Sequence, residues 1–302
     1  MSYTTTELLA SIRSAGSIPD GLFSDSDLLK AASARARSFV IPQIIKAREG
    51  YYEWDIDESV SASGTYRIPS RAIGSSVANL ALIDGDTRAD VAWIDEEELA
   101  NYAELNYSAV GAYIKGHKIY LVPATSHGYA TLRKTINLRL GRFVAVSDAA
   151  QITAINTGTG VVTCSTVPSS WTTSNSFDLM QEDPHFDWYA IEATATAVTT
   201  GSGGTVTFGS LPTWISDLTV GDWISLTDET PIIQMPVEFH EVLAQDTSNF
   251  VMRSKMDAES LKAGTDSLAE LLDGAGACIE PRWRKEGRKV KNRTGMLRRQ
   301  GG

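Results

Sequence analysis

The spacing of apolar positions predicts two helices near the start of the chain. The first has one apolar stripe and is expected to end at Gly16 and Pro19. The second begins at Ser24, a typical N-cap residue, and keeps a helical period up to Pro42, where we expect a kink or a restart before the pattern continues to Gly50. The apolar positions are Leu8, Leu9, Ile12 and Ala15 in the first helix, and Leu28, Leu29, Ala32, Ala36, Phe39, Val40, Ile44, Ile45 and Ala47 in the second.

From Ile56 to about Ser225, apolar and polar positions alternate and turn residues are frequent, which is typical of strands. The segments YRIP, SVANLALID, ADVAWI and ATLRKTINLRL are each expected to form a strand. Residues 111–123 (GAYIKGHKIYLVP) predict a hairpin with its turn at Gly116 and His117. One helix is expected in this part, at residues 96–105 (EEELANYAEL), with Asp95 as its cap.

Two segments of this β-rich part resemble each other. The segment TAINTGTGVVTCSTVPSSW from Thr153 aligns with TAVTTGSGGTVTFGSLPTW from Thr196, with one extra glycine in the turn. The alignment matches Val162 and Thr163 with Val206 and Thr207, Pro168 with Pro212, and Trp171 approximately with Trp214. Each unit predicts a β-hairpin that ends in a Pro-Trp corner. We therefore expect a compact subdomain built by duplication, because two copies are too few for a solenoid.

Helical spacing returns at Pro236, which suits the first turn of a helix that we expect to reach Met256. Its apolar positions are Phe239, Val242, Leu243, Phe250 and Val251. A last helix is expected to end at Gly274 and carries Leu261, Leu268, Leu271 and Leu272.

The predicted fold class is α+β. Only the terminal helices can complete each other's apolar faces, so we expect a helical bundle of N- and C-terminal helices with a large inserted β region and an extended C-terminal arm. The predicted parts are residues 1–55 for the N-terminal helices, 56–145 for the inserted β region with one short helix, 146–230 for the duplicated subdomain, 231–275 for the C-terminal helices and 276–302 for the basic arm.

Length and composition predict a soluble protein with a sizeable core, because 42% of the 302 residues are hydrophobic. No apolar run is long enough to cross a bilayer, and the polar N-terminal stretch lacks the features of a secretion signal. The two cysteines, Cys164 and Cys278, form neither a disulfide framework nor a metal motif, and both are expected to be reduced.

Few motifs point to catalysis. The four histidines are scattered, and the glycines of NTGTG and TTGSGG are expected to be turn glycines and not a phosphate loop. The best enzymatic candidate is QEDPHFDW, which places three carboxylates and an imidazole together; the alternative is a polar connection between the two repeat units. Its candidate residues are Glu182, Asp183, His185 and Asp187. The acidic run from Asp95 to Glu98 could bind a cation or a basic partner, but a solvated helix start also accounts for it.

The last 23 residues differ in charge from the rest of the chain. Residues 280–302 carry nine Lys or Arg and two Glu, a net charge of +7, so residues 1–279 carry −17 of the total of −10. Three interpretations remain open: an arm that binds nucleic acid, an idle solvated tail, or an arm that docks on a protein. Protein docking is favoured because apolar side chains alternate with the charges, and because the acidic body would repel a polyanion. The candidate partner-binding residues are Arg282, Trp283, Arg284, Lys285, Arg288, Lys289, Lys291, Arg293, Met296, Leu297, Arg298 and Arg299.

Several stretches of the chain resemble the head-tail connector, or adaptor, proteins of tailed bacteriophages, which form the ring beneath the portal. They are FSDSDLLKAASARARSFVIPQIIKAREGYYEWD (23–55), YRIPSRAIGSSVANLALIDG (66–85), AYIKGHKIYLVPA (112–124), PIIQMPVEFHEVLAQ (231–245) and VKNRTGMLR (290–298). None of them is a catalytic signature, but together they span most of the chain in the family's order.

The resemblance implies a structural virion protein at the head-tail interface, made in the host cytoplasm, with no catalytic activity and no cofactor. It implies a homo-oligomeric ring of about twelve copies that joins the portal protein to a tail tube or nozzle protein, with a C-terminal segment that docks on the portal. DNA would pass through the lumen without specific binding, and an acidic lining would repel its phosphates. The duplicated subdomain could hold the nozzle, a fibre or a tailspike.

Two other functions remain open at this point. Four tryptophans could serve as stacking platforms of a carbohydrate- or host-surface-binding β module of a phage tail, or could simply pack in the core. They are Trp171, Trp188, Trp214 and Trp223. A cell-wall-degrading enzyme would depend on Glu182 and Asp183 alone.

Overall fold

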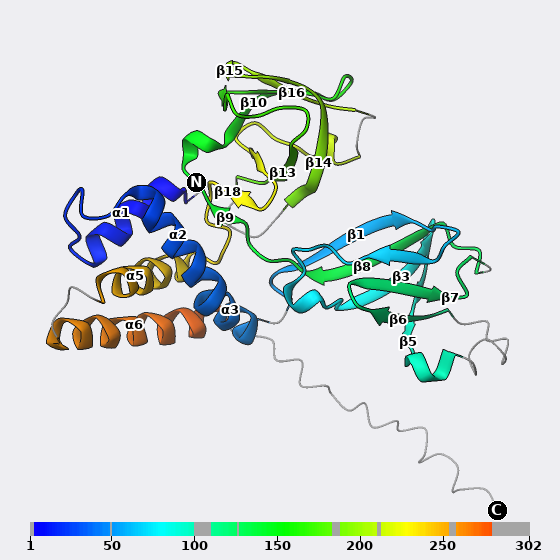
Figure 1. Ribbon diagram of the computed structural model, residues 1–302, viewed down its shortest axis with the longest axis horizontal. Helices are drawn as coiled ribbons and strands as arrows, with labels where there is room; N and C mark the ends of the chain where they lie inside the picture. The colour runs from blue at the N-terminus through cyan, green and yellow to red at the C-terminus, as the bar shows by residue number, and fades with distance from the viewer. Residues whose placement is uncertain are drawn as a thin grey trace, which may run out of the picture.

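The computed structural model describes residues 3–48, 50–99, 110–125, 127–182, 188–209, 213–253 and 258–279. The predicted α+β class is confirmed, because helices and many strands, six of them in a closed barrel, occur together. The described chain has three parts, which we call the helical body, the β region and the barrel (Figure 1). None of its helices is long and apolar enough to cross a membrane.

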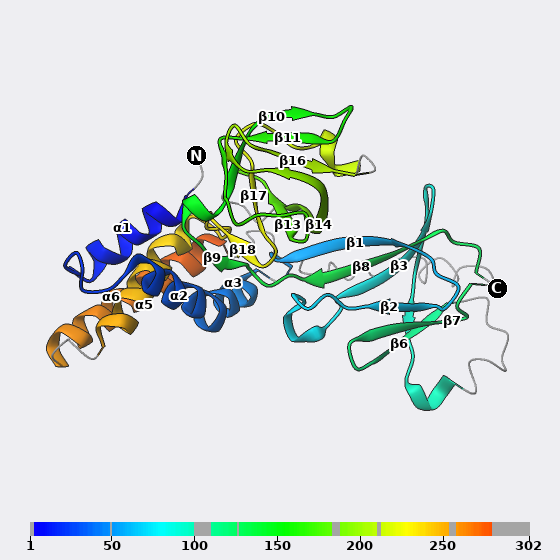
Figure 2. The ribbon, with the colours of Figure 1, turned by 45° about the horizontal axis from the view of Figure 1, so that its top comes forward.

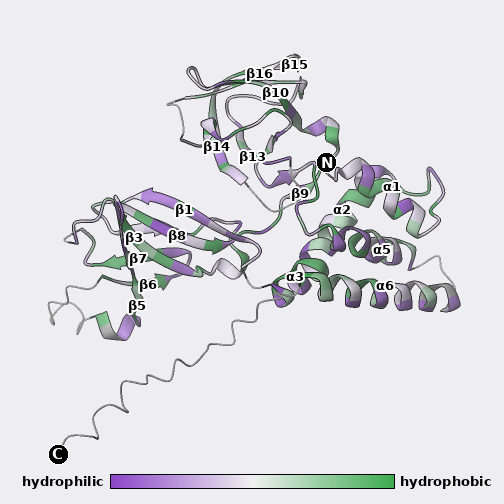
Figure 3. Ribbon diagram, turned by 180° about the vertical axis from the view of Figure 1, so that it is seen from behind, coloured by the Kyte–Doolittle hydropathy of each residue, from purple (hydrophilic) through white to green (hydrophobic). Residues whose placement is uncertain are grey.

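The helical body combines helices from both ends of the chain. Its helices are α1 (Thr5–Ala15), α2 (Asp25–Arg35), α3 (Ile41–Ala47), α5 (Glu238–Met252) and α6 (Ala258–Ile279). One apolar cluster joins them, with Leu8 and Leu28 from the N-terminal helices and Phe239 and Leu243 from α5 all almost fully buried. Helices α5 and α6 lie side by side in the views of Figures 1 and 3.

Local signals account for the start and the bend of the second predicted helix. The Ser24 side chain accepts a hydrogen bond from the Asp27 amide at 3.1 Å, which confirms Ser24 as the N-cap. Before Pro42 the helix widens into a π-helical turn (Ala36–Val40), and α3 then starts with Pro42 in its first turn. The predicted restart is confirmed, because proline cannot donate the hydrogen bond of a helix interior.

Three details of the helical prediction are wrong. Helix α6 continues through Gly274 to Ile279, because Ala275 is buried and Ile279 packs on the same apolar cluster. This packing outweighs the cost of about 1 kcal/mol for a helical glycine. Ala15 is exposed, and α5 ends at Met252 and not at Met256.

Phe250 was expected on the buried face of α5, yet it is 52% exposed. Its ring lies against the guanidinium of Arg35, which is held between Phe39 at 5.2 Å and Phe250 at 5.5 Å. Arg35 also binds Asp246 with two hydrogen bonds, of 2.6 and 2.7 Å. A buried polar link between α2 and α5 therefore takes the place that the periodicity assigned to apolar packing.

The β region consists of two four-stranded sheets that share one core (Figures 1 and 2). The first has the order β1-β8-β3-β4, and the second β2-β7-β6-β5. The strands are β1 (Glu53–Ser59), β2 (Thr65–Arg67), β3 (Asn79–Asp84), β4 (Thr87–Asp90), β5 (Ala92–Trp93), β6 (Gly111–Lys115), β7 (Lys118–Val122) and β8 (Thr131–Asn137). The hairpin at Gly116 and His117 is confirmed, with Lys115 opposite Lys118.

Other predictions in this region hold only in part. The segment ADVAWI divides at the buried Val91, so that β4 belongs to one sheet and β5 to the other. Asp95 precedes a short 3-10 helix (Glu96–Glu98), but its side chain makes no capping hydrogen bond. Residues 100–105, which complete the expected helix, lie outside the described residues.

The chain enters the barrel through β9 (Arg142–Phe143) and leaves it through β18 (Glu229–Thr230). These two strands pair in parallel, with Glu229 opposite Arg142, and form a neck beneath the barrel (Figure 2). The Phe143 amide donates to Ser33 Oγ at 2.9 Å, and Thr5 Oγ1 donates to the Val144 carbonyl at 2.8 Å. These two hydrogen bonds therefore connect the neck to the helical body.

The barrel is closed by six antiparallel strands in the order β10-β11-β16-β14-β13-β17, and β17 pairs again with β10. Its strands are β10 (Ala150–Asn156), β11 (Val161–Cys164), β13 (Ser176–Met180), β14 (Trp188–Thr199), β16 (Thr205–Phe208) and β17 (Trp223–Leu226). Two short strands, β12 (Thr166–Val167) and β15 (Gly201–Ser202), pair beside it.

The sequence repeat explains how the barrel closes. The two aligned valines, Val162 and Val206, lie directly opposite each other where β11 pairs with β16. Each repeat unit also has a third strand after its tryptophan, β13 in the first and β17 in the second, which the alignment did not reveal. Each third strand pairs with the first strand of the other unit. Three strands alone would leave open edges, but two units related by this pseudo-twofold arrangement close the barrel.

The free energy of unfolding should depend on the neutral form of His240. His240 is buried, stacks on Tyr3 with ring centroids 4.3 Å apart, and donates a hydrogen bond to the Met235 carbonyl at 3.1 Å. Burial lowers the pKa of His240, although Glu7 and Glu238 oppose this shift. Below the ordinary histidine pKa of about 6.5, the unfolded chain takes up a proton that the folded protein does not, so stability falls as pH falls. Denaturant unfolding at several pH values measures this slope.

His240→Gln should flatten that pH dependence, because glutamine can donate to the same carbonyl without titrating. His117→Gln, at the exposed hairpin turn, is the matched control and should leave the dependence unchanged. If the free energy of unfolding of His240→Gln changed with pH as steeply as that of the wild type, His240 would not be the group responsible.

Truncation of a buried side chain at the centre of the barrel should strongly lower the free energy of unfolding. Phe208 is 2% exposed and contacts Phe177 and Trp214. We expect Phe208→Ala to lower the free energy of unfolding by about 3–5 kcal/mol and Phe208→Leu by less than about 1.5 kcal/mol, as measured by urea unfolding followed by tryptophan fluorescence. Equal small effects of both changes would show that the barrel interior is loosely packed.

Candidate docking surface

All twelve candidate partner-binding residues, from Arg282 to Arg299, lie outside the described residues. The described chain reaches Ile279 at the end of α6, and this end of the helix packs on the apolar cluster of the helical body. Helix α6 also contacts α3. The structure therefore shows from which part of the molecule the basic segment continues.

Where the three parts of the molecule meet, a buried arginine forms a polar junction. Arg71, from the β region, has a side chain that is only 4% exposed and forms an ion pair with Asp178 on barrel strand β13. Its guanidinium also donates to the Arg139 carbonyl at 3.0 Å and lies 4.6 Å from the centre of the Trp188 ring.

The junction extends to the helical body through Asp228. Asp228 follows β17 and lies 3.6 Å from Arg71 Nε. Arg37, in the π-helical turn, donates to both Asp228 carboxylate oxygens at 3.2 and 3.3 Å and to the Leu140 carbonyl at 3.1 Å. One chain of charges, Arg37–Asp228–Arg71–Asp178, thus connects helical body, β region and barrel.

Asp178 also stabilises unusual backbone conformations. It accepts hydrogen bonds from the amides of Glu192 at 2.9 Å and Asp228 at 3.0 Å, and both of these residues have positive φ angles, of 56° and 65°. Such conformations are costly for residues other than glycine and persist only where the surroundings hold them. Burial raises the pKa of Asp178, and the positive charge of Arg71 and the two amide donors oppose that shift. A neutral side chain here would lose the ion pair with Arg71.

Next to the junction lies an apolar groove of about 640 Å³ between α3 and the loop after β2. Its floor consists of Ile41, Pro42, Ile45 and Ile73, and its rim of Arg37, Lys46 and Arg139, together with Ser38. Pro42 is exposed and Ile45 is partly exposed, whereas Ile41 and Ile44 of the same helix are buried. We call this surface the basic-rimmed groove.

The charges of the rim are not neutralised equally. Arg37 is paired with Asp228, whereas Lys46 and Arg139 are exposed and have no carboxylate partner among the described residues. Free positive charge around an apolar floor suits a ligand that carries negative charge beside an apolar group. The chain has a net charge of −10, so a surface with unpaired positive charge differs from its overall acidic character.

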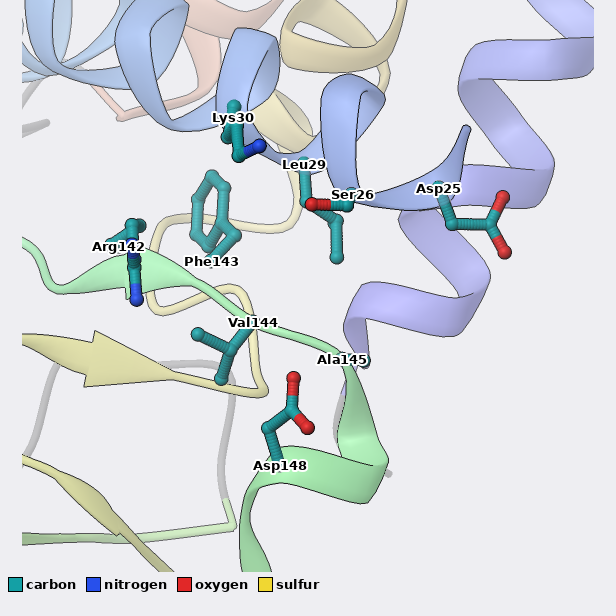
Figure 4. A pocket seen from close by; sticks show the side chains of 9 residues that line it. All are labelled: Asp25, Ser26, Leu29, Lys30, Arg142, Phe143, Val144, Ala145 and Asp148. Atoms are coloured by element: carbon teal, nitrogen blue, oxygen red, sulfur yellow. The ribbon is translucent and has the colours of Figure 1, made fainter. Parts of the chain in front are cut away.

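A second, smaller cleft of about 160 Å³ lies between the start of α2 and the neck (Figure 4). Leu29, Phe143 and Val144 form its centre, with Lys30 beside them and Asp148 below. Arg142 forms an ion pair with Glu229 across the neck. Charges of both signs surround a small apolar contact, so this cleft favours no particular class of ligand.

The tryptophans do not form a carbohydrate-stacking face. Trp171, Trp188 and Trp223 are between 2% and 5% exposed, and Trp214 packs edge-on against Phe208 at 5.1 Å. An exposed aromatic face is needed to stack on a ligand from solvent. The expectation that these residues pack in the core is therefore confirmed for the three buried tryptophans.

Of the candidate catalytic residues Glu182, Asp183, His185 and Asp187, the structure describes only Glu182, whose amide donates a hydrogen bond to Asp222 Oδ1 at 2.9 Å. Asp183, His185 and Asp187 lie outside the described residues, and the described part of the chain holds no group of three metal-ligating side chains. His117 and His127 lie in different loops of the β region, and His240 lies in α5 of the helical body. Cys164 and Cys278 are free, and burial raises the pKa of the Cys164 thiol to about 12, so that it is an unreactive core residue.

No protein-family model matches the chain, and no curated protein matches it either.

Sequence reasoning missed the junction and the groove. Arg71 and Asp178 are 107 positions apart, and no periodic pattern links them. The available signal was Asp178 itself, a single charge inside the apolar strand SFDLM, because a buried charge requires a partner. Which residue pairs with Asp178 depends on which strands pack together in the fold.

Loss of the Asp178 charge should be far more damaging than loss of an exposed one. We expect Asp178→Asn to lower the free energy of unfolding by about 3–5 kcal/mol, because it removes the buried counter-charge of Arg71 and leaves only Asp228, which is half-exposed and shared with Arg37. Asp57→Asn is the matched control, since Asp57 pairs with Arg133 on the surface of the β region and its loss should cost at most about 1 kcal/mol. Denaturant unfolding measures both, and equal effects would show that the junction does not hold the parts together.

Proposed function

We propose that this protein is a structural component of a tailed phage virion, the adaptor that joins the portal to the tail and continues the DNA channel. The observation that carries the proposal is the attachment of a segment of charge +7 to a body of charge −17. Residues 280–302 continue from α6, a helix that is exposed over most of its length. A basic segment with apolar anchors at the surface of an acidic body suits docking on a separate protein.

The finer description of the fold belongs to the same proposal. The helical body is the bundle that assembles into the ring, the β region and the barrel are insertions in that bundle, and residues 280–302, which follow the end of α6 at Ile279, are the docking arm. The shared apolar cluster of N- and C-terminal helices supports this description, as does the neck through which the barrel is inserted. The acidic excess of residues 1–279 suits the wall of a channel through which DNA slides.

Docking through the arm would make assembly depend on the portal. A single exposed ion pair contributes at most about 1 kcal/mol, so one arm would bind weakly. Many arms on one symmetric partner would act together, because each bound copy raises the effective concentration of the next. Screening over roughly 8 Å at physiological ionic strength would weaken the charges but not the burial of Trp283 and Leu297.

Deletion of residues 280–302 should abolish binding to the cognate portal protein. The truncated chain keeps every residue of the described helices and strands, so it should still fold, which circular dichroism checks. Mass measurement of mixtures with the portal gives the number of bound copies. A truncated protein that binds the portal as the full chain does would disprove the docking role of the arm.

Two further changes separate the contributions within the arm. Trp283→Ala should weaken portal binding by roughly tenfold to a hundredfold at any salt concentration, as expected for an aromatic anchor. Replacement of the nine Lys and Arg by Gln should remove the salt dependence and leave a weak residual affinity.

A further inference from the structure

The basic-rimmed groove calls for a different occupant from the chain's own arm. The arm is strongly basic, and it would place its charges against Lys46 and Arg139. Like charges brought together at an interface weaken binding and exclude the wrong partner. The occupant must instead carry carboxylates around an apolar group.

The helical body itself offers a surface with that chemistry. Val237, at the start of α5, is 58% exposed, although it is a large apolar side chain. Glu238 and Glu241 are exposed beside it, and Glu238 lines a shallow pocket of about 330 Å³ together with Glu270 of α6. We call these four residues the acidic patch.

The carboxylates of the acidic patch are available to a partner. Glu238, Glu241 and Glu270 form no ion pair with the Lys, Arg or His residues that the structure describes. The acidic strand β1 differs, because its Asp57 and Glu58 are already bound to Arg133 and Lys134. Of the acidic patch and strand β1, only the acidic patch therefore combines unpaired carboxylates with an exposed apolar side chain.

We propose that the acidic patch of one copy docks in the basic-rimmed groove of a second copy. Val237 would cover the floor formed by Ile41, Pro42 and Ile45, and the glutamates would meet Lys46 and Arg139. Arg37 would stay with Asp228 in the junction, so docking needs no rearrangement of the fold. Because the contact pairs an apolar centre with charges at its edge, it matches the usual anatomy of a protein interface.

The geometry of such a contact favours rings. The two surfaces share no residue: the groove belongs to the π-helical turn, α3, the loop after β2 and Arg139, and the patch to α5 and α6. A contact between two different surfaces of identical chains is heterologous, and it generates a closed ring when the rotation between copies closes. This inference rests on the proposed ring and names the surfaces that would form it.

Charge reversal tests the contact directly. The groove-reversed variant carries Lys46→Glu and Arg139→Glu, and the patch-reversed variant carries Glu238→Lys and Glu241→Lys. All four side chains are exposed, so both variants should keep the wild-type circular dichroism. The patch-reversed variant should unfold at a slightly lower midpoint, because Glu238 and Glu241 lie in the first turn of α5, where the helix dipole favours negative charge. Sedimentation velocity over a range of protein concentrations, at low and at physiological ionic strength, measures self-association of the full chain.

We expect wild-type protein to associate more strongly as concentration rises and salt falls, and each reversed variant alone to lose at least about tenfold in association. An equimolar mixture of the two variants should regain it, because each altered groove then meets an altered patch and each native groove a native patch. A single chain that carries all four changes should also associate. Val237→Asn should weaken association at every salt concentration.

Three results would overturn the contact: wild-type protein that shows no concentration dependence, a reversed variant that associates like wild type, or a mixture that fails to regain association. Failure of the proposed function gives a different result. In that case the charge-reversal pattern holds, but the wild-type protein does not bind the portal.

Discussion

The chain of buried and half-buried charges around Arg71 connects all three parts of this molecule. The Arg71 guanidinium pairs with Asp178 in the barrel and lies near Asp228, which in turn binds Arg37 of the helical body. An ion pair without solvent contributes little net stability compared with apolar packing, but removal of one partner is severe. The junction therefore acts mainly as a specificity device, because any other placement of the parts would leave charges buried and unpaired.

In the barrel, duplication of a three-strand unit removes the exposed sheet edges that a single unit would have. A unit of three strands offers two unpaired edges, and such edges invite association with other chains. Two units placed so that the third strand of each pairs with the first strand of the other leave no free edge. The aligned valines Val162 and Val206 meet at the centre of this arrangement, so the internal symmetry of the sequence is also a symmetry of the fold.

Charge is distributed over the molecule in a way that suits several neighbours. The basic arm and the basic-rimmed groove both carry positive charge, but the arm brings its own apolar side chains, whereas the groove provides an apolar floor. Under the proposed function, the arm would meet the portal and the groove would meet the next copy in the ring. Both contacts would weaken with salt, and the many arms on one symmetric partner would make assembly cooperative.

Elements that depend on local chemistry and periodicity could be predicted from the sequence. The Ser24 cap, the restart at Pro42, the hairpin at Gly116 and the duplicated β unit all follow from neighbouring residues, and the structure contains each of them. The mixed α+β class followed from the same patterns.

Features that depend on contacts between distant segments could not be predicted from the sequence. The extension of α6 past Gly274, the exposure of Phe250 on Arg35 and the split of ADVAWI between two sheets each reverse a local preference through packing. The junction and the groove were beyond prediction for the same reason, since their residues come from segments that periodicity cannot relate. Local propensity amounts to less than about 1 kcal/mol per residue, whereas a buried side chain or ion pair decides several kcal/mol at once.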